Sequence, residues 1–135
     1  MSALTADRNT PSRDNVDFSL PVAASTKLWA GSIACLNASG FLTKGAVSTT
    51  LKTVGVVQET VDNTLGGNGA VAGKVRRGCW KFGNSSAGDL IAAADWGAQC
   101  FIVDDQTVAK TNGGSTRSVA GIIRHVEADG VWVEF

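Results

Sequence analysis

The sequence predicts an all-β protein with at most one short helix, folded as a compact barrel-like or sandwich-like body behind an extended N-terminal arm. Gly occurs 16 times and Pro twice in 135 residues, so tight turns are expected to be frequent. Val, Ile, Thr and Phe alternate with polar residues in several short runs, and this period of two is typical of half-buried strands. Short strands joined by glycine-rich turns are typical of a sandwich or a barrel.

The first 15 residues differ in composition from the remainder of the chain. They are polar, carry both signs of charge, include Asn9-Thr10-Pro11, and lack the apolar segment of a signal peptide. We therefore expect residues 1–15 to form an extended arm and residues 16–135 to form a single β-rich domain. Without a signal peptide, the protein is expected to be made and kept in the cytoplasm.

Strands are predicted wherever apolar and polar residues alternate between turn signals. Residues 16–22 form the first, and Pro21 puts this strand at a sheet edge because proline cannot donate to a ladder. In residues 71–82 the apolar face changes parity, which predicts a bulge near Gly78. Asp129-Gly130 between two apolar runs is the strongest hairpin signal. The remaining strands are expected over residues 27–36, 41–43, 50–61, 99–103, 118–126 and 131–135.

Two further patterns concern local backbone shape. Residues 84–98 are the one segment in which a helix is expected, and it would have two turns at most. A small residue followed by paired apolar residues recurs at 30–33, 54–57 and 120–123. Glycine in a strand permits coiling or a bulge, so we expect bent strands at these three places.

The charge balance argues against a polyanionic partner. Lys plus Arg and Asp plus Glu each total 12, whereas nucleic acids and anionic membranes favour proteins with a basic excess. No apolar run approaches the roughly 18–20 residues that cross a bilayer, so no membrane partner is expected. Arg76 and Arg77 beside Trp80 leave a single-stranded nucleic-acid surface as a less favoured alternative.

No segment satisfies the requirements of a catalytic, cofactor or metal site. The glycine-rich loop at 66–74 resembles a phosphate loop, but Asn68 replaces its first glycine and Val75 its hydroxyl residue. Residues 67–72 fit a relaxed dinucleotide pattern, yet a strand follows where a helix is required, which favours a hairpin loop. His125 has no nucleophile signature around Ser118 or Cys100. We expect no enzyme, no cofactor and no metal.

The sequence also contains three cysteines and four tryptophans, which bear on the core and on possible interfaces. Cys35, Cys79 and Cys100 lack paired spacing, so buried free thiols are expected in place of disulfides or a zinc site. Four tryptophans occur with no tyrosine, and tryptophan is enriched at protein–protein hot spots. Each tryptophan is as well explained by core packing.

The order of these segments resembles the capsid decoration, or cement, proteins of tailed bacteriophages, which are encoded beside the major capsid protein. The resemblance extends over nearly the whole chain and rests on layout, through WAGSIACLNASGF, VGVVQETVDN, VRRGCWKF, CFIVDDQTVAKT and AGIIRHVEADGVWVEF. It implies a barrel-like body on the outer surface of an icosahedral shell, commonly as a homotrimer, with a dimer as the alternative. It implies no cofactor and no catalytic residue.

The expected function is therefore that of a structural virion protein on the outer capsid surface, which binds the major capsid protein and itself. The arm is predicted to contact the shell or a neighbouring copy, with Arg8, Pro11, Arg13 and Trp29 as protein-binding residues. The alternatives are a tail-tube or head–tail connector protein, the nucleic-acid module described above and, least favoured, a small-molecule or enzymatic role.

Overall fold

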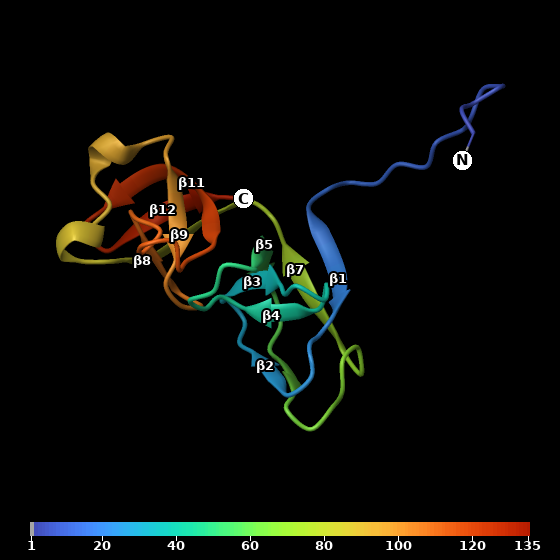
Figure 1. The fold of residues 1–135 in the computed structure, drawn as a ribbon, viewed down its shortest axis with the longest axis horizontal. Coiled ribbons are helices and arrows are strands. Elements are labelled where there is room, and N and C mark those ends of the chain that lie inside the picture. The colour runs from blue at the N-terminus through green and yellow to red at the C-terminus, as the bar shows by residue number, and fades with distance from the viewer. Residues whose placement is uncertain (1) are drawn as a thin grey trace.

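The computed structural model describes residues 2–135, so Met1 of the predicted arm lies outside the described residues. Behind the arm, two β-sheet units lie side by side (Figure 1). No α-helix is present in residues 2–135, and the prediction of an all-β fold with a barrel-like body is confirmed. None of the helical segments in this range has the length and hydropathy to span a bilayer.

The first unit is a five-stranded antiparallel sheet with a small ladder beside it. The strand order is β1 (Asp17–Pro21), β7 (Ala72–Arg76), β5 (Lys52–Val57), β3 (Ile33–Leu36) and β4 (Leu42–Lys44). The ladder pairs β2 (Thr26–Leu28) with β6 (Val61–Asn63). β1 ends at Pro21 and occupies one edge of the sheet, as its sequence predicts.

The second unit is a closed five-stranded barrel formed by the C-terminal part of the chain. Its strands follow one another as β10 (Thr107–Ala109), β8 (Cys79–Asn84), β12 (Gly130–Glu134), β11 (Val119–Glu127) and β9 (Gln99–Ile102). The predicted hairpin at Asp129-Gly130 is confirmed by the pairing of β11 with β12. The predicted helix at 84–98 is reduced to two 3-10 turns, η1 (Ala87–Asp89) and η2 (Ala93–Asp95).

Three predicted strands are interrupted in the structure. Residues 27–36 divide into β2 and β3 because a turn intervenes, where the Ser32 hydroxyl and amide both donate to the Trp29 carbonyl at 2.7 and 3.1 Å. Residues 50–61 likewise divide, since β5 ends at Val57 and the chain crosses to β6 in the small ladder. In both segments the sequence pattern continues through the turn, so it does not show where the first strand ends and the next begins.

The third interrupted strand, 71–82, crosses from one unit to the other. β7 belongs to the first sheet and β8 to the barrel, so the expected bulge at Gly78 is wrong and the parity change marks a change of sheet. Gly78 exchanges two backbone hydrogen bonds with Phe135, at 3.1 and 3.0 Å. These bonds attach the end of the chain to the junction between the units.

Bent strands occur at two of the three places where the small-residue pattern predicts them. Opposite Gly55 of β5, the register with β3 shifts between Ala34 and Cys35. Around Gly121 of β11, the register with β9 shifts between Val119 and Gly121. The third place, residues 30–33, contains the turn between β2 and β3, where Gly31 has a φ of 91°.

The central strands β3 and β5 contribute to two apolar cores at once. Successive strand residues point to opposite faces, so Ile33 and Cys35 pack against the barrel while Ala34 packs into the first unit. Val56 and Val57 divide in the same way. The barrel-side core also contains Phe82, Ile91, Cys100, Ile102, Val108, Ala120, Ile123, Val131 and Val133. The sheet therefore forms a layer between the barrel and the small ladder.

Candidate protein-binding surface

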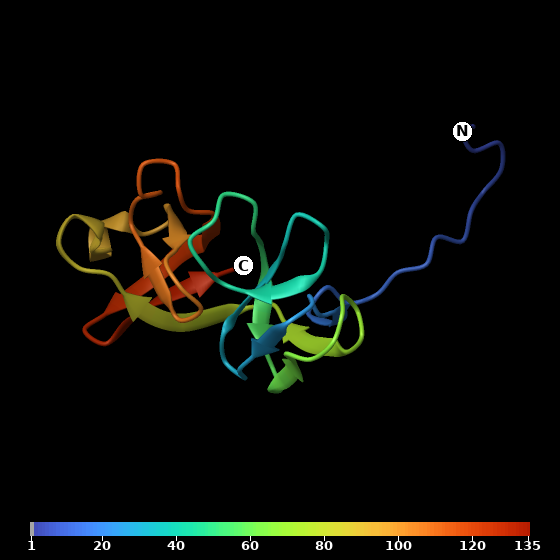
Figure 2. The same cartoon turned by 60° about the horizontal axis from the view of Figure 1, so that its bottom comes forward.

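The arm leaves the body beside the free edge of the first sheet. Residues 2–16 are exposed throughout and extend away from both units in two views (Figures 1 and 2). Within the described chain, no side chain of residues 2–15 forms a hydrogen bond or an ion pair. Leu4 is a large apolar side chain with 73% of its surface exposed. Such an arm can be ordered by a partner, at the cost of its conformational entropy.

The structure separates the four residues predicted to bind protein. Arg8 and Pro11 are exposed along the arm. Arg13, at the base of the arm, lies with its guanidinium carbon 5.6 Å from the centroid of the Phe18 ring. Trp29 is on the turn between β2 and β3, and none of its hydrogen bonds or cation–π contacts within residues 2–135 involves the arm.

Arg13 belongs to a groove that sequence reasoning did not find. The groove has a volume of about 480 Å³, and its lining comes from the arm base, β1, β3, β5, the β7–β8 connection and the chain end: Arg13, Phe18, Leu20, Leu36, Thr53, Val54, Arg77 and Phe135. Five of these eight side chains are large and apolar, so the floor is hydrophobic and the two arginines supply positive charge. Alternation in β1 predicts that Phe18 and Leu20 share a face, but both are only half-buried.

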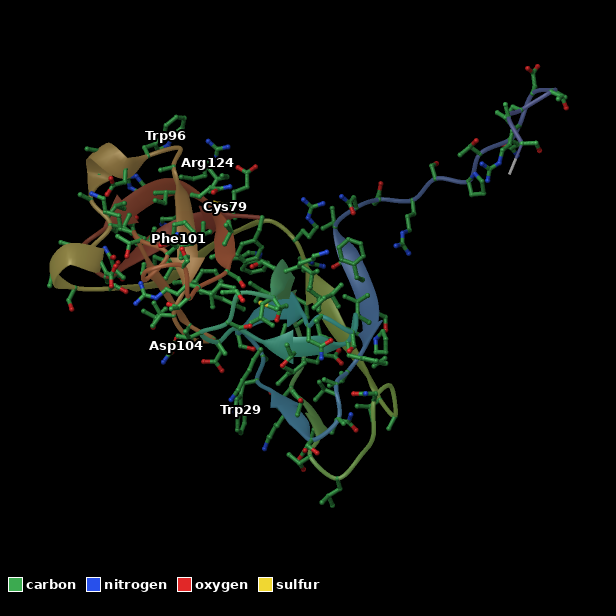
Figure 3. All side chains as sticks on the ribbon, viewed as in Figure 1. Trp29, Cys79, Trp96, Phe101, Asp104 and Arg124 are labelled. Atoms are coloured by element: carbon green, nitrogen blue, oxygen red, sulfur yellow. The ribbon has the colours of Figure 1, made fainter. Side chains whose placement is uncertain are left out.

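Two of the four tryptophans are surface residues, on different parts of the molecule (Figure 3). Trp29 is 56% exposed, and the Lys27 ammonium lies 4.0 Å from its ring centroid. Trp96 is 63% exposed, and the Arg124 guanidinium carbon lies 5.3 Å from its ring centroid. Both rings therefore present apolar area beside a cation, a combination common in protein-binding sites.

Trp80 and Trp132 are half-buried on the barrel. Trp80 packs against the barrel-side core, and its indole Nε1 is buried without a hydrogen-bond partner in residues 2–135. The sequence could not distinguish these two tryptophans from Trp29 and Trp96, because burial depends on which strand faces which sheet. For this reason the sequence alone gives no ground to distinguish Trp96 as a surface residue.

Arg76 and Arg77 are adjacent in the sequence but have different surroundings in the structure. Arg76 forms an ion pair with Asp17 across the β1–β7 ladder at 2.8 Å, and this hydrogen bond raises the pKa of the guanidinium. Arg77 lines the groove. With Trp80 packed against the barrel core, the three residues of the nucleic-acid alternative do not present one stacking surface.

Of the groups that could take part in nucleophilic chemistry, the Ser118 hydroxyl is hydrogen-bonded, the Cys100 thiol is buried and the His125 imidazole is exposed. The Ser118 hydroxyl donates to the Ser48 carbonyl at 2.6 Å and accepts from the Leu51 amide at 3.1 Å. Burial raises the pKa of the Cys100 thiol to about 11. His125 is exposed, with its Nε2 3.9 Å from a Glu127 carboxylate oxygen.

The three cysteines are free and differ in exposure. Cys35 and Cys100 are buried, as expected, whereas Cys79 is exposed, contrary to the expectation of buried thiols. Burial raises the pKa of Cys35 to about 12, because a thiolate is poorly solvated in the core. Within residues 2–135, no group of three His, Cys, Asp or Glu side chains is placed to hold a metal ion.

Comparison with protein-family models, with curated proteins and with solved structures finds no match to this chain. Function is therefore inferred from the geometry of the arm, the groove and the exposed tryptophans, together with the layout of the sequence.

Proposed function

We propose that this protein is a capsid decoration, or cement, protein of a tailed bacteriophage, which binds the outer surface of the shell and stabilises contacts between capsomers of the major capsid protein. The observation that carries the proposal is the fully exposed arm of residues 2–16 on a body made of a sheet and a closed barrel. The layout of the sequence, which resembles that family, supports the same assignment.

The physical requirements of a cement protein agree with this architecture. Such a protein adds binding energy between subunits and needs a body that keeps its shape while it does so. The closed barrel has no free edge, and its core extends into the first sheet through Ile33 and Val56. An arm and a separate tryptophan surface give two points of attachment, and two linked contacts bind far more tightly than either contact alone.

Deleting residues 2–15 is expected to weaken binding to expanded capsid shells by at least about tenfold, because one of two linked contacts is lost. The shells are assembled from the major capsid protein that is encoded beside this chain. Occupancy is measured by co-sedimentation over a range of protein concentrations. A variant in which a Gly-Ser segment of equal length replaces residues 2–15 controls for arm length.

Undiminished occupancy after the deletion would remove the arm from the mechanism. Failure of the unaltered protein to bind either expanded or unexpanded shells would overturn the capsid assignment as a whole. Assembly of the purified protein into long tubes or large rings would instead favour the tail-tube or connector alternative.

Trp29→Ala is expected to lower shell occupancy, because an exposed tryptophan beside a cation is a typical binding anchor. Trp96→Ala is the matched comparison, since Trp96 has similar exposure and also lies under a cation. The same co-sedimentation assay separates the two surfaces. If only Trp96→Ala lowers occupancy, the anchor is Trp96 on the barrel and not Trp29.

A further inference from the structure

The groove defined above has two features of an unfilled binding site. Its floor combines Phe18, Leu20, Leu36, Val54 and Phe135, none of which is fully covered. Neither of its arginines, Arg13 or Arg77, lies within 4.0 Å of a carboxylate in the part of the chain that the structure describes. An apolar floor with unpaired guanidinium groups fits an extended peptide that carries an apolar side chain and a carboxylate.

The strand that borders this groove also has a free hydrogen-bonding edge. The Arg77 amide donates to the Val16 carbonyl, and the Val22 amide donates to the Val71 carbonyl, at 2.8 and 2.9 Å. Antiparallel ladders alternate, so the even-numbered residues of β1 face β7. The amides and carbonyls of Asp17 and Ser19 consequently point outward, and β1 pairs with no other strand in residues 2–135. A segment added to this edge as a strand would direct residues three apart to opposite faces, so a ligand that places both in the groove does not pair with β1.

The arm contains a segment with the required chemistry. Leu4 is the one large apolar side chain in residues 2–15, and Asp7 follows it three residues later, about 10 Å along an extended chain. Residues 2–12 can span up to about 36 Å when extended, and the arm runs away from the body in both views (Figures 1 and 2). A neighbouring copy is therefore within the reach of Leu4.

We propose that the groove binds the arm of a second copy of this chain, with Leu4 of that copy on the apolar floor and its Asp7 paired with Arg77. An extended chain with three residues per turn directs residues i and i+3 to the same side, so Leu4 and Asp7 can face the groove together. Because the donated segment and the accepting groove are different surfaces, the contact is head-to-tail, and the assembly closes as a reciprocal pair or as a small ring. Each copy then donates one arm and accepts another.

Leu4→Asp is expected to weaken self-association of the purified protein by at least about tenfold, since burial of a leucine is replaced by burial of a charge. Sedimentation velocity over a wide concentration range measures the effect. Leu65→Asp is the matched control, because Leu65 is a fully exposed leucine on the loop between β6 and β7. The control is expected to associate as the unaltered protein does.

A charge exchange tests the pairing and shows whether the arm binds within one copy or between copies. Asp7→Arg and Arg77→Asp are each expected to weaken self-association. An equimolar mixture of the two is expected to recover a mixed complex, because the arm of the first carries the opposite charge to the groove of the second. Recovery in the mixture cannot arise from an arm folded onto its own body.

Three results would overturn the proposal: an unaltered protein that is monomeric at every concentration, self-association indifferent to Leu4→Asp, or charge-exchange variants that fail to recover on mixing. An arm that occupies its own groove gives the first result, and so does a groove reserved for a capsid peptide. Self-association is measured without shells, so its failure leaves the capsid assignment standing, and failure to bind shells leaves arm exchange standing.

Discussion

Gly55→Ala is expected to lower the free energy of unfolding by about 3 kcal/mol or more, a large part of the roughly 5–15 kcal/mol that stabilises a domain. Gly55 has a φ of 154°, a conformation that side chains rarely adopt. A Cβ atom here would lie 2.5 Å from the Arg76 carbonyl oxygen and 2.6 Å from the Val75 Cγ1. Because the obstacle includes backbone of the adjacent strand β7, the sheet itself must move to relieve the contact.

Gly67→Ala is the matched control for this experiment. A Cβ atom at Gly67 meets no atom within 4 Å, and its φ is not positive, so a change within about 0.5 kcal/mol is expected. Urea unfolding followed by circular dichroism measures both variants. A Gly55→Ala protein as stable as the control would show that β5 and β7 do not approach as closely as the structure shows.

Ile33→Ala is expected to cost about 3 kcal/mol and to weaken both units together. Ile33 is fully buried on β3, where its side chain packs into the core shared with the barrel. Its amide donates to the Asp105 carbonyl at 2.8 Å, so its backbone also connects the two units. Truncation of a buried isoleucine to alanine removes contact area and leaves a cavity, at a typical cost of about 2–5 kcal/mol.

A conservative substitution and amide hydrogen exchange make this prediction specific. Ile33→Val retains most of the side chain and is expected to cost about 1 kcal/mol. Amide hydrogen exchange then reports on the strands of the two units separately: β3 and β5 for the sheet, β11 and β12 for the barrel. Loss of protection in the sheet while the barrel stays fully protected would contradict a shared core.

The exposed surfaces show where local sequence patterns stop being informative. Alternation in residues 16–22 correctly predicts a strand, and Pro21 correctly places it at an edge. The same alternation assigns Phe18 and Leu20 to an apolar face without saying whether another element covers that face. The groove exists because nothing in residues 2–135 covers it, and its other lining residues come from positions 13, 36, 53–54, 77 and 135.

The predicted strand over residues 71–82 is divided in the structure for a related reason. Residues 71–82 have a continuous β-type composition, and a change of parity at Gly78 is compatible with either a bulge or a change of sheet. Backbone hydrogen bonds between Gly78 and Phe135 favour the second, and they join positions separated by more than 50 residues. Long-range pairing of this kind leaves no signal in a short window of sequence.

Composition and local pattern alone determined the all-β class, the edge strand, the C-terminal hairpin and the polar arm, because these depend on side-chain period and turn chemistry within a few residues. Tertiary structure decided the division into a sheet and a closed barrel, the core shared through Ile33 and Val56, and the exposure of Trp29 and Trp96. Which faces are covered depends on contacts between distant segments, and β3 can serve two cores only because the barrel packs on one of its faces and the small ladder on the other.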